Sequence, residues 1–412
     1  MRNKLAPNNG NPLQKLQELM RNRTCTFKLR AFHPDEVLKI LNKLNKHSKS
    51  CGLDTIDAYV LSLAKEELLP VITHIVNLSI TEKCFPTEWK CAKVIPLHKK
   101  NEVTYPMNYR PVALLPIISK IVERVVYLQL SEYLEENDLL HPSHHGFRSK
   151  HNTSTALLHM VDTWMEALEN DEISAVIMLD MSAAFDTIQH DILVSKMKLY
   201  GLENCALSCV KSYFSGRSQA VYIDGALSDT LDIETGVPQG SVLGPLFYIT
   251  SDLPEIIHSH VPSNNQTYNA HCEQCGNICC FADDSTFSKC DKDPLELKRS
   301  IDETYQQIDN YMSMNRLILN SDKTHLLVMC TDKKHRIHGD FNMTLNTGSE
   351  IIKPISSAKL LGGIVSNDLK WNHHIKEGGG QEDERSMFRV LTSRINALGK
   401  MAKVAPFKTC KY

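Results

Sequence analysis

Residues 175–180 read Ala175-Val176-Ile177-Met178-Leu179-Asp180, an uninterrupted apolar run that ends in a carboxylate. A short continuous run of this kind predicts a buried central strand, because a half-exposed strand would alternate apolar and polar residues. The carboxylate of Asp180 is then expected to emerge at the end of that strand. Helical and strand-like segments alternate on both sides of the run, so the sequence predicts an α+β fold.

Two further carboxylates lie in a turn-prone segment downstream. Residues 278–281 and 286–288 are predicted as strands, and Ala282-Asp283-Asp284 between them is predicted as a hairpin tip. A small antiparallel sheet would bring this tip beside Asp180. Phosphoryl transfer uses two cations about 4 Å apart, and hard cations need carboxylate ligands. An isolated Asp-Asp pair is more often an ordinary turn, so other segments have to decide between the two interpretations.

The remaining pattern predicts regular structure along most of the chain. Residues 1–31 are polar and lack a strong period, which predicts a flexible lead. Apolar residues at helical spacing predict helices at 34–44, 58–80, 117–130, 155–168, 191–200, 294–314 and 387–403. Strand-like runs occupy 92–97, 219–223 and 325–329, and a last pair of strands is predicted around 360–365. A glycine-rich turn at 236–244 enters a helix.

The composition is typical of a folded chain, and its charged residues are clustered in separate basic and acidic segments. Of the 412 residues, 42% are apolar and 23% are charged, which is ordinary for globular proteins, and the formal net charge is −2. The domain-wide basic excess of many nucleic-acid-binding proteins is missing. An enzyme that acts on phosphates with bound metal ions needs cations for the phosphates and separate carboxylates for the metal, and residues 162–191 are acidic. The basic cluster consists of Lys90, Lys93, Lys99, Lys100 and Arg110, which alone would indicate only solvated surface charge.

Cysteine usage and hydropathy indicate the cellular compartment in which the chain is expected to act. The 13 cysteines show no disulfide-like spacing and no apolar signal-peptide core follows Met1, so a reducing compartment is expected, nucleus or cytoplasm. The most apolar helical stretch, residues 59–80, is interrupted by charged residues and Pro70, whereas a spanning helix wants about 20 nearly uncharged residues. No membrane partner is expected.

Three sequence segments, in this order along the chain, indicate how the carboxylates should be interpreted. Residues 179–186 (LDMSAAFD), 236–245 (GVPQGSVLGP) and 281–284 (FADD) resemble motifs A, B and C of non-LTR (LINE-type) retrotransposon reverse transcriptases. Other strings resemble the fingers motifs, motif D and the primer-grip region of that family: residues 89–100 (WKCAKVIPLHKK), 108–124 (NYRPVALLPIISKIVER), 145–148 (HGFR), 319–324 (LNSDKT) and 359–375 (KLLGGIVSNDLKWNHHI). The resemblance runs from Phe32 to the C-terminus.

The resemblance implies an RNA-directed DNA polymerase with the right-hand polymerase fold: fingers, palm and a truncated thumb. Its partners would be an RNA template, a DNA primer and deoxynucleoside triphosphates. Asp180 and Asp283 would hold two Mg²⁺ ions, with Asp284 close by. Lys323 matches the motif D lysine, a general acid that would protonate the departing pyrophosphate.

The same resemblance implies a nucleotide-binding set. Lys99 and Arg110 match fingers positions that clamp the triphosphate, which suits a point charge and a bidentate fork. Gln239, between glycines, would face template or nucleotide. Phe185 matches a bulky aromatic beneath the ribose, with a plain core phenylalanine as the alternative. Asp186 is instead expected to cap or anchor the helix that follows.

By analogy with the family, the chain divides into consecutive regions. These are the lead at 1–31, an N-terminal extension and fingers at 32–174, a palm at 175–345, a primer-grip region at 346–384 and the start of a truncated thumb at 385–412. The palm would contain a fingers insertion near 205–235 and a Cys/His-rich insertion near 254–280.

The Cys/His-rich insertion raises the question of a zinc site. Cys272 and Cys275 have the spacing of a metal hook, and Cys279, Cys280 or a histidine of the insertion would complete four ligands for Zn²⁺. However, the last two cysteines fall in a predicted strand where apolar residues belong, and free cysteine is commonly a small buried hydrophobe. Both interpretations stay open at the level of sequence.

Three functions compete for these motifs. The first is an active RNA-directed DNA polymerase. The second is a catalytically inactive or domesticated fragment that acts as an RNA-binding protein, and the third is a group II intron-like or telomerase-like polymerase, which fits the strings less well. The intact Asp180 and Asp283 favour the active enzyme, because a pure scaffold has no use for clustered like charges.

Overall fold

A computed structural model describes the protein at residues 10–45, 47–181, 184–250, 252–257, 276–331, 334–335, 343–348 and 350–369. The chain divides into two compact units, each assembled from segments far apart in the sequence. Unit 1 comprises 1–140, 183–252 and 314–317; unit 2 comprises 141–182, 253–313 and 318–412. The predicted palm at 175–345 is therefore divided between the units, because most of 183–252 packs with the N-terminal helices. None of the described helices combines the length and apolarity needed to cross a membrane.

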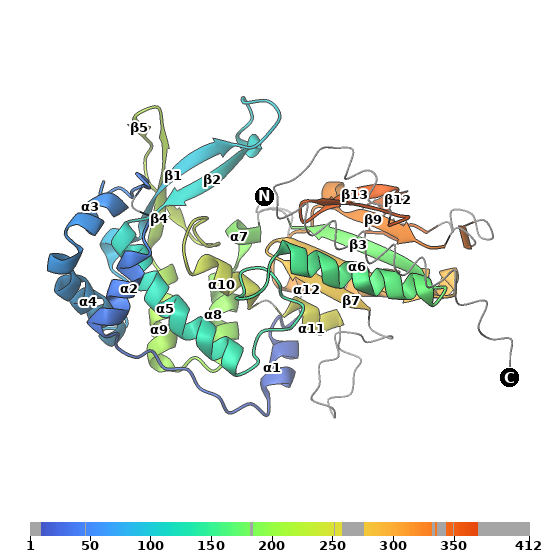
Figure 1. The fold of residues 1–412 in the computed structure, drawn as a ribbon, viewed down its shortest axis with the longest axis horizontal. Coiled ribbons are helices and arrows are strands. Elements are labelled where there is room, and N and C mark those ends of the chain that lie inside the picture. Colours follow the sequence, from blue (N-terminus) through green and yellow to red (C-terminus); the bar gives the residue numbers. More distant parts are fainter. Residues whose placement is uncertain are drawn as a thin grey trace, which may run out of the picture. The chain divides into compact units, whose positions relative to one another are not determined.

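Unit 1 is a helical core with a small sheet (Figure 1). Its helices are α1 (Gln14–Met20), α2 (Pro34–Asn42), α3 (Ala58–Leu63), α4 (Lys65–Thr81), α5 (Ile117–Glu136), α7 (Ala184–Thr187), α8 (His190–Leu199), α9 (Asn204–Phe214) and α10 (Gly244–Ile249). Its strands are β1 (Cys91–His98), β2 (Tyr109–Leu114), β4 (Arg217–Ile223), β5 (Ala226–Leu227) and β6 (Leu231–Ile233).

Helix α5 lies at the centre of this core. Val125, Leu130 and Leu134 are fully buried and pack in one cluster with apolar residues of α2, α4, α8 and α9. Such burial of side chains removes apolar area from water and is the main source of stability. The predicted helix at 58–80 is divided at Ala64, whose φ of −107° and ψ of 24° are not helical.

The N-terminal lead differs from the prediction. Residues 10–31 include α1, and Leu16 and Phe27 are buried in the core of unit 1. The amide of Phe27 also donates to the carbonyl of Gly201 at 2.8 Å. The segment is too short and too polar to show a helical period, so its packing could not be predicted. Residues 1–9 lie outside the described part of the chain.

Unit 2 is built on a five-stranded sheet with the order β12-β9-β3-β8-β7. Its strands are β3 (Ile173–Asp180), β7 (Asn277–Phe281), β8 (Asp284–Asp291), β9 (His325–Met329), β10 (Leu345–Asn346), β11 (Ile351–Ile352), β12 (Pro354–Ile355), β13 (Ser357–Leu360) and β14 (Gly363–Ser366). Its helices are α6 (Thr153–Glu169), α11 (Leu253–Ile257) and α12 (Pro294–Met314).

Strand β3 is the predicted buried central strand. It pairs antiparallel with β8 on one side and with β9 on the other. Val176 and Met178 pack in one cluster with apolar residues of α6, while Ile177 and Leu179, which point to the opposite face, are also buried. Burial of both faces explains why the run is continuous, and it leaves Asp180 as the first partly exposed residue at its end.

Candidate active site

The paired strands of unit 2 bring the predicted metal-binding carboxylates together at one end of β3 and β8. Asp180 is directly opposite Asp284 in the β3–β8 ladder. Strands β7 and β8 form a hairpin in which Phe281 pairs with Asp284, so Ala282 and Asp283 are its two-residue tip. Asp283 and Asp284 are exposed, and Asp180 is partly exposed. The structure therefore confirms the predicted hairpin and its place beside Asp180.

The segment that resembles motif D, residues 319–324, is hydrogen-bonded to Asp180. The Nζ of Lys323 lies 2.8 Å from the Oδ2 of Asp180, and the Nδ2 of Asn320 lies 3.2 Å from that oxygen. The amide of Asn320 donates to the carbonyl of Asp180 at 2.9 Å, and Met181 bridges to Leu319. Asn320 was not assigned a role from sequence, although it lies inside the string that resembles motif D. The structure thus joins Lys323 and Asp180, which are 143 positions apart.

These carboxylates suit a hard cation. Within the described residues, no three His, Cys, Asp or Glu side chains lie close enough to form a complete metal site. Magnesium does not require one, because it is usually held by one or two carboxylates together with water and substrate phosphates. Asp180 at a strand end and the exposed Asp283 offer such carboxylates, so the residues present fit magnesium.

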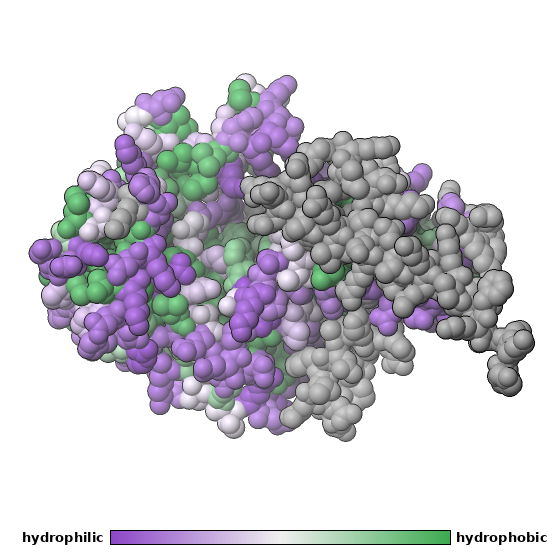
Figure 2. Space-filling view, in the orientation of Figure 1, coloured by the Kyte–Doolittle hydropathy of each residue, from purple (hydrophilic) through white to green (hydrophobic). Residues whose placement is uncertain are grey.

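In unit 1, the predicted triphosphate clamp lies on the β1–β2 pair. Arg110 is opposite Leu97, and the amide of Lys99 donates to the carbonyl of Asn108 at 2.8 Å. Lys99 directly follows β1 and Arg110 is the second residue of β2, so the two cations lie at the same end of the pair. Both are exposed. The surface around this sheet mixes hydrophilic and apolar areas (Figure 2); its exposed apolar side chains include Leu97, Ile223, Leu227 and Leu231.

The glycine-rich turn packs against β2, the strand that carries Arg110. The amide of Ala113 donates to the carbonyl of Gln239 at 2.7 Å. Gly240 has a φ of +121°, and a Cβ built on it would lie 2.7 Å from the carbonyl oxygen of Ala113. Only glycine fits a backbone that approaches so closely in this conformation. Unit 1 therefore brings Gln239 next to the strand of Arg110.

Gln239 also contacts Asp186, which corrects the expected role of that residue. The Nε2 of Gln239 lies 2.9 Å from both carboxylate oxygens of Asp186. Partial burial raises the pKa of Asp186, and the hydrogen bond from Gln239 opposes the rise. Asp186 lies within α7 and orients the amide of Gln239, rather than serving only as a cap. Since the amide nitrogen is held, the side-chain oxygen of Gln239 remains to accept a hydrogen bond.

Phe185 lies in the same part of unit 1. Its carbonyl accepts from the amide of Val237 at 2.8 Å, which ties it to the glycine-rich turn. Its ring is half-buried against the helical core, with its centroid 5.0 Å from that of Tyr248. Phe185, Gln239 and Arg110 are thus placed on neighbouring segments, as the nucleotide-binding assignment requires.

A buried carboxylate beneath the turn was missed from sequence. Glu123 of α5 is fully buried, and its Oε2 accepts from the amides of Val242 at 2.6 Å and Leu243 at 3.2 Å. Burial raises the pKa of Glu123, while the nearby buried Arg217 and the two amides lower it. Glu123 therefore fixes the turn where it enters α10. A glutamate in a helical pattern gives no signal of this kind, because glutamate is usually exposed.

The four cysteines predicted as zinc ligands divide into two pairs. Cys272 and Cys275 lie outside the described residues. Cys279 and Cys280 are consecutive buried residues of β7, so their side chains point to opposite faces of the sheet. Burial raises the pKa of Cys280 to about 12, which keeps its thiol protonated. Both residues fit the alternative of small buried hydrophobes.

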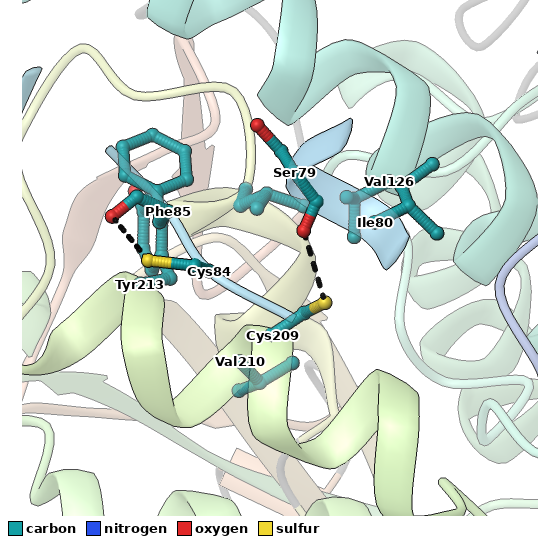
Figure 3. A pocket seen from close by; sticks show the side chains of 9 residues that line it. Ser79, Ile80, Cys84, Phe85, Val126, Cys209, Val210 and Tyr213 are labelled. Carbon is teal, nitrogen blue, oxygen red and sulfur yellow. Dashed lines mark hydrogen bonds between the residues drawn. The ribbon is translucent and has the colours of Figure 1, made fainter. Parts of the chain in front are cut away.

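A small pocket in unit 1 is separate from the predicted site residues. Figure 3 shows Cys84 and Cys209 at this pocket, with their thiols directed at the carbonyls of Phe85 and Ser79. Its lining is mostly apolar: Ser79, Ile80, Cys84, Phe85, Val126, Cys209, Val210, Tyr213 and Leu243. Within the described chain, none of the predicted site residues lines it.

Comparisons with known proteins identify relatives among mobile elements of Drosophila melanogaster. The chain is 29% identical over 367 residues to the RNA-directed DNA polymerase from mobile element jockey, covering 88% of this chain and 38% of that relative. It is 32% identical over 227 residues to the probable RNA-directed DNA polymerase from transposon X-element, covering 54% and 25%. It is 27% identical over 396 residues to the probable RNA-directed DNA polymerase from transposon BS, covering 91% and 40%.

The chain spans less than half the length of each of these three relatives. The family model for reverse transcriptase (RNA-dependent DNA polymerase) matches residues 97–365, which is more than half of the chain. This range contains the carboxylates of unit 2 and the predicted nucleotide-binding residues of unit 1. The resemblance seen in the motifs is therefore confirmed, and the chain belongs to the reverse transcriptase family.

Proposed function

We propose that this chain is the polymerase part of a non-LTR retrotransposon protein, which adds deoxynucleotides to a DNA primer on an RNA template. The observation that carries the proposal is the placement of Asp180 at the end of a buried central strand, directly opposite Asp284 of the hairpin. Family membership supports the same activity. Carboxylates paired across strands repel one another, which is tolerated where they serve a cation.

The right-hand description of the family supplies names for the parts. The sheet of unit 2 corresponds to the palm, and the β1–β2 pair of unit 1 corresponds to the fingers. The primer-grip assignment falls on β13 and β14, which form an antiparallel pair at 357–366. Residues 370–384 of that region and the thumb assignment at 385–412 lie outside the described residues.

The chemistry divides among a few side chains. Asp180 and Asp283 would hold two magnesium ions, which would activate the primer 3′-hydroxyl and stabilise the leaving pyrophosphate. Lys99 and Arg110 bind the triphosphate and bring their positive charge to its oxygens. Gln239, held by Asp186, contacts the nucleotide through its side-chain oxygen. Lys323 donates a proton to the pyrophosphate oxygen as it departs.

A primer-extension assay tests the proposal directly. Purified protein is given a homopolymer RNA template, a complementary DNA primer, the matching deoxynucleotide and Mg²⁺, and Asp283→Ala is compared with wild type. Asp229→Ala is the matched control, because Asp229 is an exposed aspartate in a loop of unit 1. The proposal expects extension by wild type and Asp229→Ala only. A wild-type protein that binds the RNA but extends no primer would support the RNA-binding alternative.

A further inference from the structure

A loop of unit 2 lies against the hairpin that carries Asp283. We define residues 141–148 as the brace loop; the string HGFR forms its second half. Strand β7 is at the edge of the five-stranded sheet, and among the described residues no further strand pairs with its outer backbone groups. The brace loop occupies that edge at one position, where His144 bridges to Cys280.

Backbone hydrogen bonds join the brace loop to the base of the hairpin. The amide of Cys280 donates to the carbonyl of Ser143 at 2.9 Å. The carbonyl of Cys280 accepts from the amides of His145 at 2.8 Å and Gly146 at 3.4 Å. Cys280 is three residues before Asp283. An edge strand that is paired in this way loses the freedom to fray.

The brace loop then reaches the tip itself. A Cβ built on Gly146 would lie 2.4 Å from the amide nitrogen of Ala282 and 3.1 Å from the carbonyl carbon of Phe281. No side chain fits in that space, since both neighbours are backbone atoms. Ala282, with a φ of +53°, immediately precedes Asp283. The backbone of Gly146 is therefore in van der Waals contact with the turn that sets the position of Asp283.

The conformation of the brace loop is itself held from within. Phe147 has a φ of +58°, which a residue with a bulky side chain rarely adopts. The guanidinium of Arg148 donates to the carbonyls of His141 at 3.0 Å and His144 at 3.4 Å. A strained backbone persists only where its surroundings fix it, and strain of this kind is concentrated at functional sites. Arg148 supplies that constraint by joining the two ends of the loop.

We propose that the brace loop positions the hairpin tip, and thereby the carboxylate of Asp283, with Gly146 and Arg148 as positioning residues. The inference rests on the proposed function only in assigning Asp283 to catalysis. The contact with the hairpin is independent of that assignment. A misplacement of a catalytic group by about 1 Å costs about 100-fold in rate, so a brace of this kind affects turnover more than binding.

Hydrogen exchange and kinetics together test the proposal. The variant is Gly146→Ala, and the matched control is Ser149→Ala, an exposed position just beyond the loop. In the metal-free protein, Gly146→Ala should speed amide exchange in the peptide covering residues 277–291 by about tenfold or more, as overpacking at a tight site does. In primer extension, kcat should fall by about 100-fold while KM for the deoxynucleotide changes by less than about twofold.

A second variant covers the case in which Gly146→Ala does not fold. Arg148→Lys keeps the charge but replaces the planar guanidinium, whose Nη1 donates to both carbonyls, with an ammonium on a shorter side chain. It should show the same pattern at smaller size: faster exchange at 277–291 and a lower kcat. The proposal would be overturned if a folded Gly146→Ala protein exchanged amides at 277–291 at the wild-type rate. If Gly146→Ala does not fold, the same result in folded Arg148→Lys would overturn it. If exchange changes but wild type itself extends no primer, the brace stands and the proposed function fails.

Discussion

The Nζ of Lys323 lies 2.8 Å from the Oδ2 of Asp180, in an ion pair whose side chains are 49% and 25% exposed. An exposed ion pair of this kind is worth only a fraction of a kcal/mol, so it can be exchanged at little cost. The same carboxylate is a proposed ligand of magnesium. Lys323 therefore provides a countercharge for Asp180, in addition to its proposed role as a proton donor.

Replacing Lys323 should separate these two roles. Lys323→Met removes the proton donor and should lower kcat by about 100-fold, within the usual range for general acid catalysis. It also removes the competing cation, so the Mg²⁺ concentration for half-maximal rate should fall. Lys323→Arg retains the charge and should leave the Mg²⁺ requirement close to wild type. A rise in the Mg²⁺ requirement of Lys323→Met would show that Lys323 does not compete for Asp180.

Asp180→Asn should abolish incorporation while leaving the fold intact. The substitution keeps the shape of the side chain, and its amide oxygen still accepts from Lys323 and Asn320. What it removes is the negative charge that a magnesium ligand supplies. Primer extension tests the loss of incorporation, and thermal unfolding of the same preparation tests whether the fold is intact. Activity above one per cent or so of wild type would contradict the assignment, since the metal ligands carry most of the rate.

The pairing of Gln239 with Asp186 should appear as an energetic coupling. Asp186→Ala releases the amide of Gln239 and should raise KM for the deoxynucleotide by about tenfold, which corresponds to one hydrogen bond to a charged group. Asp186→Asn retains an acceptor and should have a smaller effect. In a Gln239→Ala background, Asp186→Ala should add little further loss, because the two residues act as one unit. Independent, additive losses would mean that the contact plays no part in nucleotide binding.

Elements with a long and regular pattern could be predicted from the sequence. The expected helix at 294–314 and the expected strand at 325–329 coincide with α12 (Pro294–Met314) and β9 (His325–Met329). The continuous apolar run identified β3 because a strand buried on both faces cannot alternate. The hairpin tip followed from its turn-prone residues. These signals are local, and the sequence displays them directly.

Contacts between distant segments could not be predicted. Asp186 and Gln239 are 53 positions apart, and Glu123 lies 119 positions before Val242. No periodic pattern in the sequence signals either contact, because each depends on how two elements pack. The tight fit of Gly146 against Ala282 is of the same kind: the glycine was visible, but the backbone that it faces was not.

Acid should destabilise the protein through His145. Burial, together with nearby His151, His159, Arg148 and His144, lowers the pKa of His145 from 6.5 to about 4. Between pH 6.5 and 4 the unfolded state therefore binds more protons than the folded state, so stability falls as pH falls through this window. From pH 7 to pH 5 the loss from this residue is about 2 kcal/mol.

Thermal unfolding at pH 7 and pH 5 checks the role of His145. His145→Gln should lose part of the acid sensitivity, because glutamine does not titrate. His74→Gln is the control, since His74 is exposed on α4, and it should behave as wild type. Equal pH dependence of His145→Gln and wild type would place the acid sensitivity elsewhere.

Phe185 should decide which sugar the enzyme accepts. Its ring is half-buried beside Tyr248, and its backbone is tied to the glycine-rich turn that carries Gln239. A ring beneath the ribose would collide with a 2′-hydroxyl, and such a clash lowers the affinity for ribonucleotides without affecting deoxynucleotides. Phe185→Val should therefore improve the relative incorporation of ribonucleotides by about tenfold or more, a size expected when a pocket gains a few carbon atoms of room. The lost packing should cost about 1–2 kcal/mol of stability, so unfolding is measured beside kinetics. Phe185→Tyr, which keeps the ring, should retain the wild-type preference. If a folded and active Phe185→Val enzyme prefers deoxynucleotides as strongly as wild type does, Phe185 serves the core of unit 1 and another residue excludes the 2′-hydroxyl.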